Sequence, residues 1–86
     1  MTSTQQIGSL LEQLLEDSSV PKNVRAAISR AKDKLADPES ESTGISGAIY
    51  SLDEVSNDIN LPMHARTMIW NILSELEQLL KEHEAD

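Results

Sequence analysis

The sequence LEQLLEDSSVPKNVRAAISRAKDKL, residues 11–35, returns 41 positions later as LDEVSNDINLPMHARTMIWNILSEL, residues 52–76. Six positions are identical between the two copies, and conservative exchanges such as Leu14 with Val55 lie between them. A pattern that repeats at a fixed spacing is the signature of a duplicated structural unit. We therefore interpret the chain as two tandem copies of one helix-turn-helix unit. The identical pairs are Leu11 and Leu52, Asp17 and Asp58, Pro21 and Pro62, Arg25 and Arg66, Ile28 and Ile69, and Leu35 and Leu76.

The composition restricts the class of protein. With 86 residues the chain is predicted to form one domain, close to the lower size at which a core is stable without disulfides or a metal. It has no cysteine, which excludes disulfides and thiolate chemistry. Residues 1–6 are polar and unlike a signal peptide, and no apolar run reaches the roughly 18 residues of a membrane span. We expect an acidic cytoplasmic protein, with a net charge of −8, that binds no membrane.

Hydrophobic periodicity predicts four amphipathic helices and hence an all-α fold, a four-helix bundle. Repeat one is expected at about residues 4–36, a polar linker at 37–43 and repeat two at about 44–83. The fourth helix is expected to run from Pro62 to about Glu82. Gly44 and Gly47 weaken the third helix at its start, by up to about 1 kcal/mol each relative to alanine. The predicted core positions are Ile7, Leu10, Leu11, Leu14, Leu15, Val20, Val24, Ala27, Ile28, Ala31, Leu35, Ile45, Ala48, Ile49, Leu52, Val55, Ala65, Met68, Ile69, Ile72, Leu73, Leu76, Leu79 and Leu80.

Both repeats carry the same residues where the chain turns between helices. Ser19 and Asn60 are predicted to cap the helix that follows, and a proline is predicted in its first turn, where a missing N–H costs nothing. Asp17 and Asp58 are expected to place a carboxylate on the positive end of that helix, with Arg25 or Arg66 reaching back to it. Because these residues occur in both copies, we interpret them as structural.

Two stretches resemble known families. Residues 10–35, LLEQLLEDSSVPKNVRAAISRAKDKL, resemble a HEAT-type unit, with an Asp at the turn and Val-Arg opening the second helix. Residues 51–78, SLDEVSNDINLPMHARTMIWNILSELEQ, more specifically resemble a small family of uncharacterised archaeal proteins, over nearly the whole chain. That resemblance implies a compact four-helix bundle, bromodomain-like in arrangement. It implies no activity, because the family has no catalytic or binding residues to carry over.

Patterns for catalysis and for metal binding are absent from the sequence. The two histidines, His64 and His83, are 19 residues apart and cannot form a helical zinc pair. The chain has no glycine-rich phosphate loop, and the residues at the second turn lack the glycine and distal glutamate of an EF-hand. We therefore expect no catalytic residue, no metal and no cofactor, and a protein that is not an enzyme.

One group of residues stands out as a candidate interaction surface: Tyr50, Met63, Arg66 and Trp70. The three apolar members lie off the predicted helical stripes, and repeat one has Ser9, Lys22 and Ser29 at the matching positions. Arg66 precedes Trp70 by one helical turn and could stack on its indole. Two interpretations stay open: the indole fills the flank between the second and fourth helices, or the group contacts a partner, either a separate protein or a second copy in a homodimer.

A second candidate surface lies on the helix of residues 22–34, which carries five of the seven basic residues and one acid. Lys22, Arg25 and Lys32 fall within about 80° of one another around this helix and form a candidate basic docking face. This charge either relieves repulsion between acidic neighbours or docks an acidic partner. The function classes are accordingly a small non-enzymatic protein-interaction module or assembly subunit or, as the alternative, an RNA- or ribosome-associated factor that docks through helix 22–34.

Overall fold

The computed structural model describes residues 4–36 and 41–84, without the side chains of Glu41, His83 and Glu84. Four helices account for nearly all of this part of the chain, and no strand occurs within it. The all-α prediction and the four-helix bundle are thus confirmed. The helices are α1 (Thr4–Glu16), α2 (Lys22–Ala36), α3 (Glu41–Val55) and α4 (Met63–Glu84).

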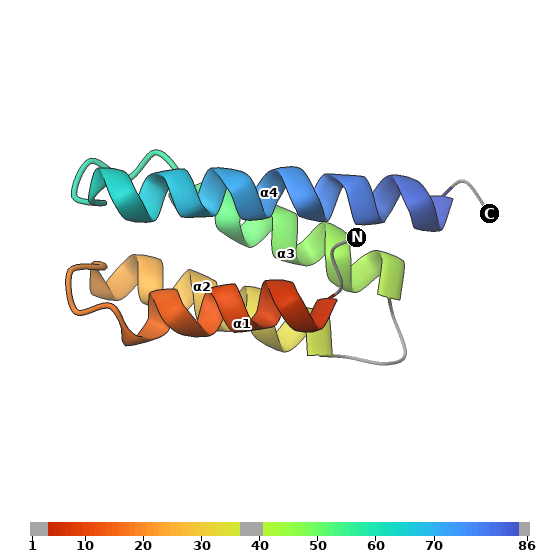
Figure 1. Ribbon diagram of the computed structural model, residues 1–86, viewed down its shortest axis with the longest axis horizontal. Helices are drawn as coiled ribbons and strands as arrows, with labels where there is room; N and C mark the ends of the chain where they lie inside the picture. The colour runs from red at the N-terminus through yellow and green to blue at the C-terminus, as the bar shows by residue number, and fades with distance from the viewer. Residues whose placement is uncertain (1–3, 37–40, 85–86) are drawn as a thin grey trace.

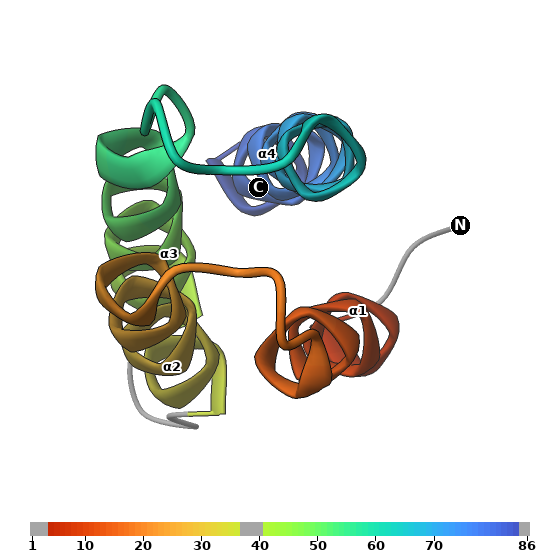
Figure 2. The same ribbon diagram turned by 90° about the vertical axis from the view of Figure 1, so that its left-hand side faces the viewer.

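The helices form two antiparallel hairpins, α1 with α2 and α3 with α4, whose short turns lie at the same end of the bundle (Figure 1). Viewed from that end, α2 and α3 lie side by side, and α1 and α4 lie on the other side of the bundle (Figure 2). Repeat two therefore packs on repeat one chiefly through α3 against α2. The bundle is elongated, at 39 × 20 × 19 Å.

The core contains most of the apolar stripes that the periodicity predicts, together with Leu61. The predicted positions that are only half-buried and pack against its edge are Leu10, Leu15, Leu35, Ile49, Met68, Leu73, Leu79 and Leu80. Each hairpin exposes its stripe to the other hairpin, so burial of both stripes requires both repeats. Complete burial of a Leu or Ile side chain contributes roughly 1.5 to 3 kcal/mol. The buried apolar residues are Ile7, Leu11, Leu14, Val20, Val24, Ala27, Ile28, Ala31, Ile45, Ala48, Leu52, Val55, Leu61, Ala65, Ile69, Ile72 and Leu76.

Helix α3 begins earlier than the sequence indicates. Residues 41–43 were assigned to the linker but are helical, while residues 37–40 lie outside the described part of the chain. Both Gly44 and Gly47 are consequently inside α3. The fourth helix agrees with its prediction within two residues at its end.

The two glycines of α3 allow α2 to approach closely. A Cβ atom at Gly44 would lie 2.5 Å from the backbone oxygen of Lys34, and one at Gly47 would lie 2.7 Å from Cδ of the same lysine. The first contact is with backbone and cannot relax, whereas the second is with a flexible side chain. Gly8 in α1 differs, because its Cβ would meet nothing within 4 Å. Close packing thus explains Gly44 but not Gly8.

The turn between the helices has the same hydrogen bonds in both repeats. In the first turn, the backbone oxygen of Asp17 accepts hydrogen bonds from the N–H of Val20 at 3.2 Å and from Nη2 of Arg25 at 3.1 Å. In the second, the backbone oxygen of Asp58 accepts from Leu61 N at 3.1 Å and from Arg66 Nη2 at 2.8 Å. The structural interpretation of these residues therefore agrees with their contacts.

Two details of the predicted turn are wrong. The guanidinium of Arg25 or Arg66 binds the backbone carbonyl of the aspartate, not its carboxylate. The carboxylates instead accept the N–H of the residue two positions on, Ser19 at 2.9 Å and Asn60 at 2.8 Å. This is the local Asx-turn that competes with helix capping.

Ser19 and Asn60 therefore do not cap the following helices. The first helical hydrogen bond is accepted two residues later, by the carbonyl of Pro21 in repeat one and of Pro62 in repeat two, each at 2.9 Å. Each proline thus occupies the capping position itself.

The glycines give a matched test of this packing. Gly44→Ala should lower the free energy of unfolding by about 1 to 3 kcal/mol, because a methyl group at this position overlaps the Lys34 carbonyl. Gly8→Ala should raise it by up to about 1 kcal/mol, since the helix gains propensity without a clash. Urea unfolding of both variants measures the difference. Equal effects of the two substitutions would contradict the assigned role of Gly44.

Candidate functional site

The two turns are joined to each other by a reciprocal pair of contacts. Nδ2 of Asn23, at the start of α2, donates a hydrogen bond to Oδ2 of Asp58 in the other turn at 2.7 Å. Nε2 of His64, at the start of α4, lies 2.7 Å from Oδ2 of Asp17. Asn23 and His64 occupy equivalent positions of the two repeats, 41 residues apart. Each repeat therefore binds the turn of the other through the same position.

These contacts lower the pKa values of both aspartates. The pKa of Asp17 falls from 3.8 to about 2, mainly because its carboxylate accepts the hydroxyl of Ser19 and then because of the contact with His64. The pKa of Asp58 is lowered chiefly by the hydrogen bond from Asn23 and secondly by the backbone N–H of Asn60. Hydrogen bonds to the ionised carboxylate favour the charged form. Both turn carboxylates thus accept hydrogen bonds from other residues of the fold.

The structure exposes all three apolar residues of the candidate interaction surface. Trp70 is 48% exposed, Met63 66% and Tyr50 74%. Helices α2 and α4 lie diagonally opposite in the bundle and their backbones do not contact each other, so the indole does not fill a flank between them (Figure 2). Contact with a partner stays a prediction. Ile59, in the second turn, is 91% exposed and was missed. The signal for Ile59 was present in the sequence, because repeat one has Ser18 at the matching position.

These four residues, Tyr50, Ile59, Met63 and Trp70, are the large apolar side chains that the described part of the chain exposes, and we call them the apolar face. All four belong to repeat two. Met63 and Trp70 are seven residues apart in α4 and project from the same side of the helix. Ile59 precedes them in the turn, and Tyr50 lies on the outer side of the neighbouring helix α3.

The side chain of Arg66 contacts the second turn. Its side chain is half-buried, and its Nη2 donates to the carbonyl of Asp58. The sequence could not distinguish this role from stacking on Trp70, because both partners lie within reach of a long side chain.

The candidate basic docking face is largely occupied by contacts within the chain. Arg25 is half-buried and donates to the carbonyls of Asp17 and Val20. Lys32 forms an ion pair with Glu12 of α1. Of the three predicted cations, Lys22 is the exposed one with no described ion pair. The charge of α2 thus serves in part to neutralise an acidic neighbour.

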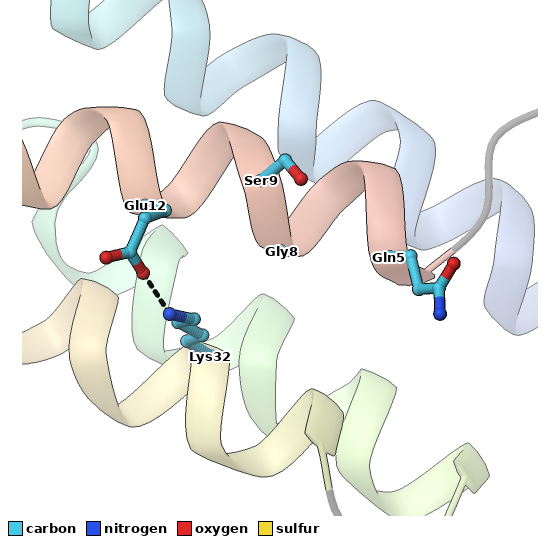
Figure 3. Close-up of a pocket in the computed structure, with 5 residues that line it drawn as sticks. All are labelled: Gln5, Gly8, Ser9, Glu12 and Lys32. Carbon is cyan, nitrogen blue, oxygen red and sulfur yellow. Dashed lines mark hydrogen bonds and ion pairs between the residues drawn. The ribbon is translucent and has the colours of Figure 1, made fainter.

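That ion pair borders a shallow hollow between α1 and α2 (Figure 3). Glu12 and Lys32 meet at one end of the hollow and Gln5 lies at the other, with Gly8 between them. In repeat two the position of Gly8 is taken by Ile49, which is half-buried. Gly8 places no side chain in the hollow.

Metal binding has no support in the described part of the chain, where no group of three or more His, Asp or Glu side chains is placed to hold an ion. The side chain of His83 lies outside the described residues. None of the helices described is long and apolar enough to cross a membrane.

The known proteins that resemble this chain in sequence belong to a family of uncharacterised proteins. The model of UPF0147, an uncharacterised protein family, matches residues 2–79. A UPF0147 protein of Methanothermobacter thermautotrophicus is 45% identical over 74 residues, covering 85% of this chain and 72% of that protein. One from Archaeoglobus fulgidus is 44% identical over 72 residues, covering 84% of this chain and 83% of the relative.

A solved structure supports the same fold. The crystal structure of MMP1188, a protein of unknown function, matches with a TM-score of 0.81 and 47% sequence identity. The match covers 86% of this chain and 85% of that one. The expected membership of an archaeal family and the helical architecture are therefore confirmed.

The lowered pKa values predict acid sensitivity of the turns. A carboxylate whose pKa is depressed in the folded state stabilises the fold above its unfolded pKa, and that stabilisation is lost as the pH falls through the folded pKa. For Asp17 the loss should occur between pH 3.8 and about 2. Asp17→Asn should lower the melting temperature at neutral pH. Between pH 3.8 and about 2, the melting temperature of this variant should fall less than that of the wild type. Asp33→Asn, at an exposed position of α2, is the control and should follow the wild type.

The turn arginine provides a second test. Arg66→Ala removes a charge-assisted hydrogen bond to a half-buried carbonyl, and it should lower the free energy of unfolding by about 1 to 3 kcal/mol. Arg30→Ala removes an exposed arginine and should change the same quantity by less than about 0.5 kcal/mol. Denaturant unfolding of both variants at neutral pH measures this difference. Equal unfolding midpoints of the two variants would show that Arg66 does not stabilise the turn.

Proposed function

Because the chain belongs to the UPF0147 family of uncharacterised proteins, its role must be argued from its surface, and we propose that it is a small non-enzymatic protein-interaction module or assembly subunit of the cytoplasm. Its working surface is the apolar face. The observation that carries this proposal is the difference between the repeats. Ser9, Ser18, Lys22 and Ser29 stand in repeat one where repeat two has Tyr50, Ile59, Met63 and Trp70.

The difference matters because the two repeats share one backbone plan. Repeat one folds with polar side chains at these four positions, so the scaffold itself does not call for apolar groups there. Single exposed apolar residues are ordinary, but exposed Trp and Tyr side chains are the kind that contribute most at the centre of protein interfaces. Their placement on one repeat supports a surface for a protein partner or a second copy.

The alternative, docking on RNA, has weaker support. It depends on Lys22, Arg25 and Lys32 as free cations, and two of the three are used by contacts within the chain. The net charge of −8 also opposes general attraction to a polyanion. We therefore favour a protein partner over RNA.

Trp70→Ser tests the proposed function by giving repeat two the residue of repeat one. It should change the free energy of unfolding by less than about 1 kcal/mol, as expected for a surface substitution. It should weaken self-association, or capture of a protein from native extract, by about tenfold or more. Sedimentation and comparative capture measure this, with Asn71→Ser as the control at the next exposed position of α4.

Two results would contradict the proposal. One is a loss of about 3 kcal/mol or more in Trp70→Ser, which would place the indole in the core. The other is binding that is the same in the wild type, Trp70→Ser and Asn71→Ser.

A further inference from the structure

A second hollow lies between α2 and α3, on the side of the bundle where the two repeats meet. Arg30 and Lys34 of α2 line it, and Ser46, Gly47 and Tyr50 of α3 lie opposite. We call these five residues the basic hollow. Tyr50 lines this hollow and is also one of the four residues of the apolar face.

The lysine of the basic hollow is positioned by the packing of the two helices. A Cβ atom at Gly47 would lie 2.7 Å from Cδ of Lys34 and 3.4 Å from its Nζ, so the lysine stem lies across the glycine. The missing side chain therefore makes room for the lysine, whose ammonium group lies against α3. Gly44, one turn earlier, lets the backbone of α2 approach to the distance that this arrangement needs.

Within the described residues, the two charges of the hollow have no acidic partner. Neither Arg30 nor Lys34 forms an ion pair with another residue in the ranges 4–36 and 42–82. Lys32, between them in sequence, is by contrast paired with Glu12. Arg30 and Lys34 are one helical turn apart, which places their Cβ atoms about 6 Å apart. The two adjacent cations and a serine hydroxyl can donate charge-assisted hydrogen bonds to paired anionic groups, and the exposed ring of Tyr50 lies beside them.

We propose that the basic hollow binds an acidic segment of a partner protein, with two carboxylates on Arg30 and Lys34 and apolar side-chain atoms against Tyr50. Glutamates one turn apart on a helix have the same spacing as the two cations. The proposal rests on the proposed function for its choice of a protein ligand. It adds the chemistry of the partner: a segment that is acidic where it meets α2 and apolar where it meets the apolar face.

An acidic protein segment fits the hollow better than nucleic acid does. Proteins that bind nucleic acid through its backbone commonly contact about 6 to 10 phosphates, and the hollow offers two cations. The remainder of the chain is acidic and repels a long polyanion, whereas a segment with two carboxylates meets the positive charge locally.

The test is a nuclear magnetic resonance titration of the full chain. The probe is a short alanine-based helical peptide with pairs of glutamates one turn apart, and its control is the same peptide with glutamine in place of glutamate. The glutamate peptide should shift the amide signals of Lys34, Gly47 and Tyr50, while the glutamine peptide should leave them in place. Added salt should weaken the binding.

Charge variants test the two cations directly. Arg30→Gln combined with Lys34→Gln should weaken binding of the glutamate peptide by about tenfold or more. Lys22→Gln combined with Lys81→Gln removes the same charge at exposed positions away from the hollow and should weaken it by less than about twofold. Trp70→Ser leaves the hollow intact, so it tests the proposed function separately.

Several outcomes would overturn the proposal. If both double variants weaken binding of the glutamate peptide equally, the net charge of the protein, and not the basic hollow, explains the binding. Absence of peptide binding, or signal shifts confined to other residues, would remove the site. Tighter binding of an oligouridylate than of the glutamate peptide at the same residues would make the hollow a nucleic-acid site.

Discussion

A single helical hairpin of this protein cannot bury its own apolar stripe, and the rest of the structure depends on that constraint. Each stripe is buried when the second hairpin packs on the first through α2 and α3. Both turns then lie at one end of the bundle, where each can contact the other repeat (Figure 2). Asn23 and His64 make these contacts from equivalent positions, so the duplicated sequence produces a duplicated interaction.

The pattern of the sequence contains most of the core but little of the detail at the turns. Positions such as Leu11, Ile28 and Ile69 follow a helical period, and a period determines which face is buried. The start of α3 was missed because residues 41–43 belong to a polar stretch that follows Pro38, and a polar stretch of this kind favours a linker.

Other features depend on contacts between residues that are distant in sequence. Asn23 reaches Asp58 across 35 positions, and no local pattern predicts which acid it meets. Lys32 likewise pairs with Glu12 of α1, 20 positions away, so it is not a free member of the predicted basic docking face. Comparison of the two repeats marked Trp70 and Tyr50 as positions off the apolar stripes, but it left open whether the indole is buried, and the structure exposes both side chains.

This separation is the central claim about the protein: repeat two retains the buried face of repeat one and differs from it at an outward surface available for function. The most direct measurement is urea unfolding, followed by circular dichroism, of a variant with repeat one's residues at all four positions of the apolar face. Its substitutions are Tyr50→Ser, Ile59→Ser, Met63→Lys and Trp70→Ser. The claim predicts that the free energy of unfolding changes by less than about 2 kcal/mol in total. A loss of more than about 5 kcal/mol would show that the apolar face is part of the core and would contradict the account.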